Sequence, residues 1–145
     1  MKKEIINKIN RNERFVLSST SINYKINKEN NSTICYGEFK LTFRGFPIET
    51  VSINDYCIKS PNDIDNEVFA KKLAKAKMER NAYIWLKSYF MNTSLHELTS
   101  LTIPIEKKKI NPHKLLTYIN NSIKFAEDMI AHQNYYIYKV LENGN

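Results

Sequence analysis

The sequence predicts an α+β fold, in which an antiparallel meander of three to four strands packs on helices and is followed by a long C-terminal helix. Three segments in the first half alternate apolar and polar residues, which is the period of a half-buried strand. In the second half, apolar residues recur every three or four positions, which is the period of a helix. The 145 residues, 42% of them hydrophobic, suffice for a domain with its own core.

We expect residues 1–145 to form a single domain. Residues 1–91 would hold a short helix, the meander and a basic helix, and residues 92–145 would hold an edge segment and the C-terminal helix. The chain shows neither an internal repeat nor an interdomain linker.

The N-terminal part begins with a short amphipathic helix predicted over residues 2–10, where three isoleucines have helical spacing. The first strand is predicted from alternating apolar residues, Ile22, Tyr24 and Ile26, with residues 15–17 as a candidate start. The polar run KENNS at residues 28–32 predicts a turn.

Two further strands complete the predicted meander. Five residues of the second strand share one face: Cys35, Gly37, Phe39, Leu41 and Phe43. The run RGFP at residues 44–47 predicts the next turn, and the third strand alternates Val51, Ile53 and Cys57 with polar residues. Consecutive strands with short loops are typical of an antiparallel meander with one buried face.

The spacing of apolar residues changes from that of a strand to that of a helix at residues 60–67, SPNDIDNE. These residues have the features of a helix start. A proline, the cap candidates Asp63 and Asp65, and acids that complement the helix dipole all fall there. The helix is predicted to run to about Phe90.

Residues 92–110 allow two interpretations. Their apolar residues alternate: Leu101, Ile103 and Ile105. This alternation predicts a fourth strand, which Pro104 would confine to a sheet edge. A short helix over residues 94–98 is the alternative, and the run EKKK at residues 106–109 predicts a loop.

The C-terminal helix has the clearest signal, with Asn111 as a cap and Pro112 at its first position. Eight residues then recur at steps of three and four: Leu116, Ile119, Ile123, Ala126, Ile130, Gln133, Ile137 and Val140. This heptad-like stripe either faces the core of its own domain or forms the interface of a homodimer or partner complex. Ala126 and Gln133 at seam positions weaken a tight two-stranded coiled coil.

Composition narrows the class of protein. The chain has 22 basic and 15 acidic residues, a net charge of +7, which favours contact with phosphates or acidic protein surfaces. Its two cysteines form no CxxC motif, so we expect free thiols in a reducing compartment.

The sequence shows no signal peptide and no apolar stretch of membrane-spanning length. We therefore expect a cytoplasmic protein without membrane contact.

We expect neither a metal, nor a cofactor, nor catalysis. The candidate metal ligands lack ligand spacing: His96, His113, His132, Cys35 and Cys57. Cys57 could cluster with Asp55 and His96, but no motif of a nucleophilic enzyme accompanies them. Helix capping accounts for the acids at residues 63–67 better than a calcium loop, which would need a central glycine and a closing glutamate.

The predicted basic helix carries a cluster of cations: Lys71, Lys72, Lys75, Lys77 and Arg80. Lysines near a helix N-terminus oppose the dipole, so either phosphate contact or a solvated face explains them. The order of a helix, three strands and a helix opening with KKLAK is similar to the double-stranded-RNA-binding domain, whose last helix grips phosphates with a KKxAK cluster. The resemblance covers residues 2–90, although KENNS replaces that family's GPxH-like loop.

A second resemblance is to small phage proteins in which a strand leads into a proline, an acid and a helix with a small-x-x-basic repeat. The matching residues are Pro61, Asp63, Asp65, Leu73, Ala74 and Lys77. The chain departs from that pattern, with no cysteine before the proline and no glycine at Phe69 or Ala70. The resemblance implies a mobile-element origin and, because such proteins often bind host nucleoproteins, an anti-CRISPR-like inhibitor.

We therefore predict a small non-enzymatic binding protein, phage- or plasmid-encoded, that docks on nucleic acid or a nucleoprotein and inhibits it. The predicted contact residues are Lys71, Lys72, Lys75, Lys77, Arg80, Lys107, Lys108 and Lys109. The alternative is a protein-interaction module that dimerises or binds a partner through its C-terminal helix. The predicted interface residues are Leu116, Ile119, Ile123, Ile130, Ile137 and Val140.

Overall fold

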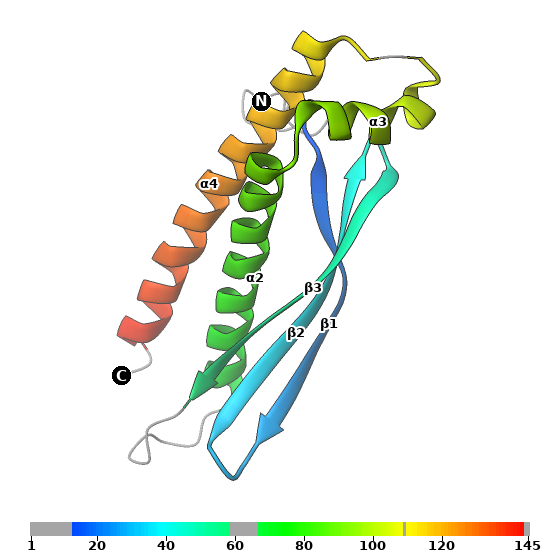
Figure 1. Cartoon of the computed structure of the whole chain (residues 1–145). Helices are drawn as coiled ribbons and strands as arrows, with labels where there is room; N and C mark the ends of the chain where they lie inside the picture. Colours follow the sequence, from blue (N-terminus) through cyan, green and yellow to red (C-terminus); the bar gives the residue numbers. More distant parts are fainter. Residues whose placement is uncertain (1–12, 59–66, 109, 144–145) are drawn as a thin grey trace.

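A computed structural model describes residues 13–58, 67–108 and 110–143. In this part of the chain three strands precede three helices: β1 (Val16–Asn27), β2 (Ser32–Phe43), β3 (Phe46–Ile58), α2 (Glu67–Asn92), α3 (Leu95–Glu106) and α4 (Pro112–Asn143) (Figure 1). The predicted α+β class is confirmed. The helix predicted over residues 2–10 and the helix start at residues 60–66 lie outside the described residues.

The three strands form an antiparallel sheet in the order β1-β2-β3, which confirms the predicted meander. The first turn occupies residues 28–31, within the predicted run. The second turn has only Arg44 and Gly45, with φ angles of 52° and 85°. Two successive positive φ angles give the turn a twist that matches the twist of the flanking strands. Gly45 adopts its positive φ angle without a steric penalty, because it has no side chain.

A bulge interrupts β1. The pairing of β1 with β2 shifts between Ser19 and Ser21, which leaves Thr20 as an extra residue. Before the bulge Leu17 packs toward the helices, and after it Ile22 does so. An extra residue reverses the alternation of a strand. The residues of β1 that face the helices are therefore odd-numbered before Thr20 and even-numbered after it.

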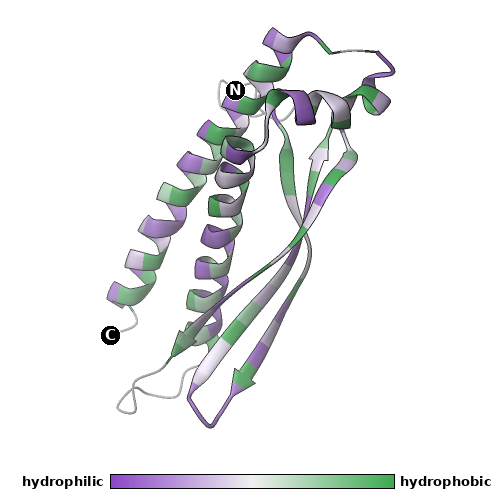
Figure 2. Cartoon of the chain, viewed as in Figure 1, coloured by the Kyte–Doolittle hydropathy of each residue, from purple (hydrophilic) through white to green (hydrophobic). Residues whose placement is uncertain are grey.

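One face of the sheet is covered by α2, and α4 packs on the other side of α2, so α2 lies between the sheet and α4 (Figure 1). The predicted inward face of β2 is confirmed, because all five of its residues are buried. Hydrophobic and hydrophilic residues alternate along the strands and recur along both long helices (Figure 2). The sheet therefore buries one face and leaves the other open, as the alternation predicted.

The predicted fourth strand is wrong, because residues 95–106 form α3. Ser94 caps this helix by accepting a hydrogen bond from the Glu97 amide at 3.1 Å. Leu98 and Thr102, one helical turn apart, are its buried residues. Capping and one-sided burial outweigh the apolar alternation that predicted a strand. Pro104 is tolerated in the last turn, and Lys107, with φ of 60°, ends the helix.

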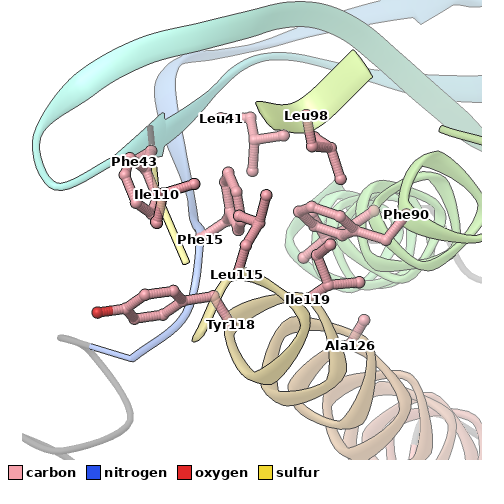
Figure 3. Close-up of a cluster of buried hydrophobic side chains, with 11 residues drawn as sticks. Phe15, Leu41, Phe43, Phe90, Leu98, Ile110, Leu115, Tyr118, Ile119 and Ala126 are labelled. Carbon is pink, nitrogen blue, oxygen red and sulfur yellow. The ribbon is translucent and has the colours of Figure 1, made fainter. Parts of the chain in front are cut away.

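Large side chains fill one end of the molecule and form what we call the aromatic core (Figure 3). Its buried residues are Phe15, Leu41, Phe43, Leu86, Phe90, Leu98, Ile110, Leu115, Tyr118, Ile119 and Ala126. The ring of Phe15 lies 4.9 Å from that of Phe43 and 4.8 Å from that of Phe90, centroid to centroid. The Tyr118 ring of α4 lies 5.6 Å from that of Phe43, so these contacts join the start of β1, the end of β2, the end of α2 and the start of α4.

Arg44 fastens the β2–β3 turn to the helices beside the aromatic core. Its guanidinium donates a hydrogen bond to the Tyr118 hydroxyl at 2.6 Å and lies 2.6 Å from a Glu106 carboxylate oxygen. The hydrogen bond to Tyr118 raises the pKa of Arg44 above its ordinary value. The turn is thus held against both α3 and α4.

Small side chains form the core at the other end, which we call the alanine core. Its buried residues are Cys35, Phe39, Cys57, Leu73, Ala74, Ala76, Met78, Ala82 and Ile137. The alanines let α2 approach the sheet and α4 closely. A methyl group added to Gly37 would lie 2.6 Å from the Phe39 ring and 2.7 Å from the Met78 sulfur, so a larger residue here would require these side chains to shift.

Candidate functional site

Lys72 and Lys75 lie on the exposed side of α2, near its start, at the edge of a groove between α2 and α4. The groove has a volume of about 310 Å³. Its lining residues, which define the α2–α4 groove, are Lys72, Lys75, Ala76 and Glu79 from α2, and His132, Gln133 and Tyr136 from α4. The groove lies toward the C-terminal end of α4, beside the alanine core.

The small and polar seam residues explain why the helices leave an opening there. Ala76 contributes only a methyl group, and Gln133 replaces the apolar residue expected at a heptad seam. The buried Gln133 amide donates a hydrogen bond to Glu79 at 3.1 Å, so its polar group is satisfied within the chain. The residue that weakened the coiled-coil interpretation therefore joins α4 to α2.

The charges of the groove are unequal. Lys75 lies 3.8 Å from the Glu79 carboxylate, which also accepts the hydrogen bond from Gln133. Within the described part of the chain Lys72 forms no ion pair, and the opposite wall carries the imidazole ring of His132. Lys75 therefore neutralises Glu79. The positive charge of Lys72 remains, in a groove that the Tyr136 ring also lines.

The neighbouring cations of the predicted cluster point elsewhere. The Lys71 ammonium lies 5.5 Å from the centre of the Tyr24 ring, over β1. Lys77 donates a hydrogen bond to the backbone oxygen of Tyr56 at 2.6 Å and lies 3.7 Å from the Asp55 carboxylate. These two lysines connect α2 to opposite edges of the sheet.

Arg80 and the α3 lysines are also separate from the groove. Arg80 donates a hydrogen bond to the Asn134 side chain on α4 at 3.0 Å. Lys107 and Lys108 are exposed at the end of α3, at the opposite end of the molecule from the start of α2 (Figure 1). Lys109 lies outside the described residues. The structure thus brings together only Lys72 and Lys75 of the eight predicted contact residues around one groove.

The predicted interface stripe of α4 packs against α2 of the same chain. Ile119 is buried in the aromatic core and Ile137 in the alanine core, while Ile123 and Val140 are half-buried against them. Ile130 is also half-buried, and Leu116 is exposed. The interpretation of the stripe as core-facing therefore accounts for most of its residues, and dimerisation through α4 stays a prediction.

Sequence reasoning missed the α4 wall of the groove. His132 and Tyr136 are one helical turn apart, so they share a face of α4. The available signal was a group of tyrosines, Tyr135, Tyr136 and Tyr138, in a helix whose apolar stripe needs none of them. All three are exposed.

Both thiols of the chain lie in the core. Cys35 and Cys57 are buried free cysteines. Burial, and then the nearby Glu79, raise the pKa of the Cys35 thiol, which is the reverse of what an activated nucleophile requires. Among the described residues no three histidine, cysteine or acidic side chains lie close enough to hold a metal ion.

Comparisons with known protein families, with curated proteins and with solved structures found no match. Across the described ranges, none of the helices is long and apolar enough to cross a membrane.

Proposed function

We propose that this chain binds nucleic acid, free or within a nucleoprotein, through the rim of the α2–α4 groove. One observation supports this proposal most: Lys72 and Lys75 face Tyr136 and His132 across the groove. Ammonium groups bind backbone phosphates, while an exposed aromatic ring offers a surface on which a base can stack. A groove that holds both ammonium groups and an aromatic ring can contact the phosphates and a base of the same nucleic-acid strand.

The net charge of +7 supports the same proposal, because a positive field attracts a polyanion and raises its association rate. The proposed activity is binding without chemistry. By covering the nucleic acid of a host nucleoprotein the chain would inhibit it, as an anti-CRISPR-like protein of phage or plasmid origin does.

The test is the affinity of the intact chain for labelled single-stranded DNA, duplex DNA and RNA, measured by fluorescence anisotropy. Reversing both groove lysines, Lys72→Glu with Lys75→Glu, should weaken binding by about tenfold or more, because two phosphate contacts become repulsive. The matched control is Lys114→Glu with Lys124→Glu, two exposed lysines in the N-terminal half of α4.

Both pairs of substitutions change the net charge by the same amount, so a general field effect would weaken binding equally in both. Loss of binding in the groove pair, with a change of less than about threefold in the control, supports the proposal. Equal losses would show that the groove is not the contact surface. The preferred nucleic acid is whichever of the three probes shows the largest difference between the two pairs.

A further inference from the structure

The two edges of the sheet differ in how their backbone groups are protected. Along the outer edge of β3, Lys77 donates a hydrogen bond to the Tyr56 backbone oxygen at 2.6 Å, and Asn81 donates one to the Asn54 backbone oxygen at 3.2 Å. Residues two apart in a strand point their carbonyls to the same side, so these α2 side chains cover successive acceptors of one edge. Pro47, near the start of β3, removes a donor as well.

The edge of β1 has no comparable protection among the described residues. Its partner is β2 on one side, and its other side is the edge of the sheet along all 12 residues. Over Val16–Asn27 the chain has one charged residue, Lys25, and no proline. Natural edge strands are usually short, charged or covered, because unpaired backbone groups would otherwise pair with another strand.

After the bulge, β1 carries apolar and aromatic side chains on one face and polar side chains on the other. Ile22, Tyr24 and Ile26 face the helix side of the sheet, in register with Gly37, Cys35 and Thr33 of β2. Tyr24 is 38% exposed and Ile26 is 39% exposed, so α2 does not fully cover this strip. The polar residues between them lie on the open face.

We propose that a second copy of this chain adds its β1 antiparallel to this edge, with the two-fold axis at Tyr24. In that register Ile22 lies opposite Ile26 of the second copy, and the two Tyr24 side chains meet on the axis. On the open face, Asn23 lies opposite Lys25 of the second copy. Apolar residues then pair only with apolar ones, and the two lysines do not face each other directly.

The bulge supports this register independently. The shift at Thr20 ends the regular part of β1, which leaves Ser21–Asn27 as a continuous stretch. Tyr24 is the middle residue of that stretch, so a two-fold axis there uses the whole of it. The result is a continuous six-stranded sheet with α2 of both copies on the same face.

A single pair of strands is smaller than a standard interface, which buries about 1,600 Å². We therefore expect a dimer that dissociates in the range of about 10–100 μM. The inference does not depend on nucleic-acid binding, because the β1 edge and the α2–α4 groove share no residue.

The experiment is sedimentation equilibrium of the intact chain at concentrations across this range, with charge variants at Asn23. Asn23→Lys would place two lysines opposite the partner's Lys25 residues and should weaken the dimer by about fivefold. Asn23→Glu would place a carboxylate opposite the same lysines and should strengthen the dimer by about fivefold. Asn23 is exposed, so neither variant disturbs the core.

The matched controls are Tyr36→Lys and Tyr36→Glu, which make similar changes of net charge on the central strand. Tyr36 is 39% exposed and is on the open face, one strand away from the proposed junction. The proposal predicts opposite shifts for the two Asn23 variants and small shifts for the controls. A chain that stays monomeric up to about 1 mM, or Asn23 variants that behave like their controls, would overturn it.

Discussion

The two ends of the α2–α4 pair are built from side chains of different size. At one end, four aromatic rings pack together, one each from the start of β1, the end of β2, the end of α2 and the start of α4, and the Arg44 side chain lies against two of them. At the other end, alanines and a close contact between Met78 and Gly37 hold the layers together, and the outer surface opens into the α2–α4 groove. The comparison indicates that stability is concentrated in the aromatic core, while the alanine core leaves room for a binding surface.

The largest expected effect is in the aromatic core. Phe90→Ala should lower the free energy of unfolding by about 3–5 kcal/mol, because Phe90 is buried against Phe15 and Tyr89 and its removal leaves a cavity. Urea denaturation measures the loss. The adjacent Met91 is 66% exposed, so Met91→Ala should change stability by less than about 0.5 kcal/mol. Equal losses in the two variants would contradict the proposed difference between core and surface.

An intermediate effect is expected in the alanine core. Gly37→Ala should cost about 1–3 kcal/mol, because the new methyl group overlaps the Phe39 ring and the Met78 sulfur. Met78→Ala in the same chain removes part of this overlap, so the double variant should lose less stability than the sum of the two single losses. Simple additivity would show that Met78 is not what restricts this position.

A smaller effect is expected at alkaline pH. Burial raises the pKa of Tyr83 above the ordinary value of about 10, and nearby Glu79 adds to the shift. The stabilisation linked to this phenol is complete below the unfolded pKa and is lost as the pH rises through the folded pKa. The free energy of unfolding should therefore fall above about pH 10, and less steeply in Tyr83→Phe.

The exposed Tyr138 supplies the control for this pH dependence. Tyr138→Phe removes the hydroxyl of a residue that is 62% exposed, and it should leave the alkaline slope of stability close to that of the unmodified chain. An identical slope in all three proteins would show that Tyr83 does not contribute to the alkaline loss.

The strands could be predicted closely from the sequence, because alternation reports directly which face is buried. The bulge in β1 has a sequence signal as well, because the apolar positions change from odd to even numbers between Leu17 and Ile22. Beyond residue 98 the helix α3 could not be predicted, because Leu101, Ile103 and Ile105 have the alternate spacing of a strand. Its cap, Ser94 with Glu97 three residues later, was the stronger signal.

The candidate site could be predicted only in part. Lys72 and Lys75 were identified from the charge pattern, but the same pattern included Lys77, which Asp55 and a backbone oxygen of β3 engage. A helix sequence does not show which of its cations another element neutralises. The wall formed by His132 and Tyr136 depends on how α4 packs on α2, and that packing is a long-range property of the fold.

The salt dependence of nucleic-acid binding tests the central claim most directly. The logarithm of the binding constant should fall linearly with the logarithm of the salt concentration, because each phosphate contact releases about one counterion. The slope for Lys72→Glu with Lys75→Glu should be smaller than that of the unmodified chain by about two. Urea denaturation should show that this variant is folded, with a loss of less than about 1 kcal/mol from the lost pair of Lys75 with Glu79. An unchanged slope in that folded double variant would contradict the claim that the groove lysines contact the phosphates.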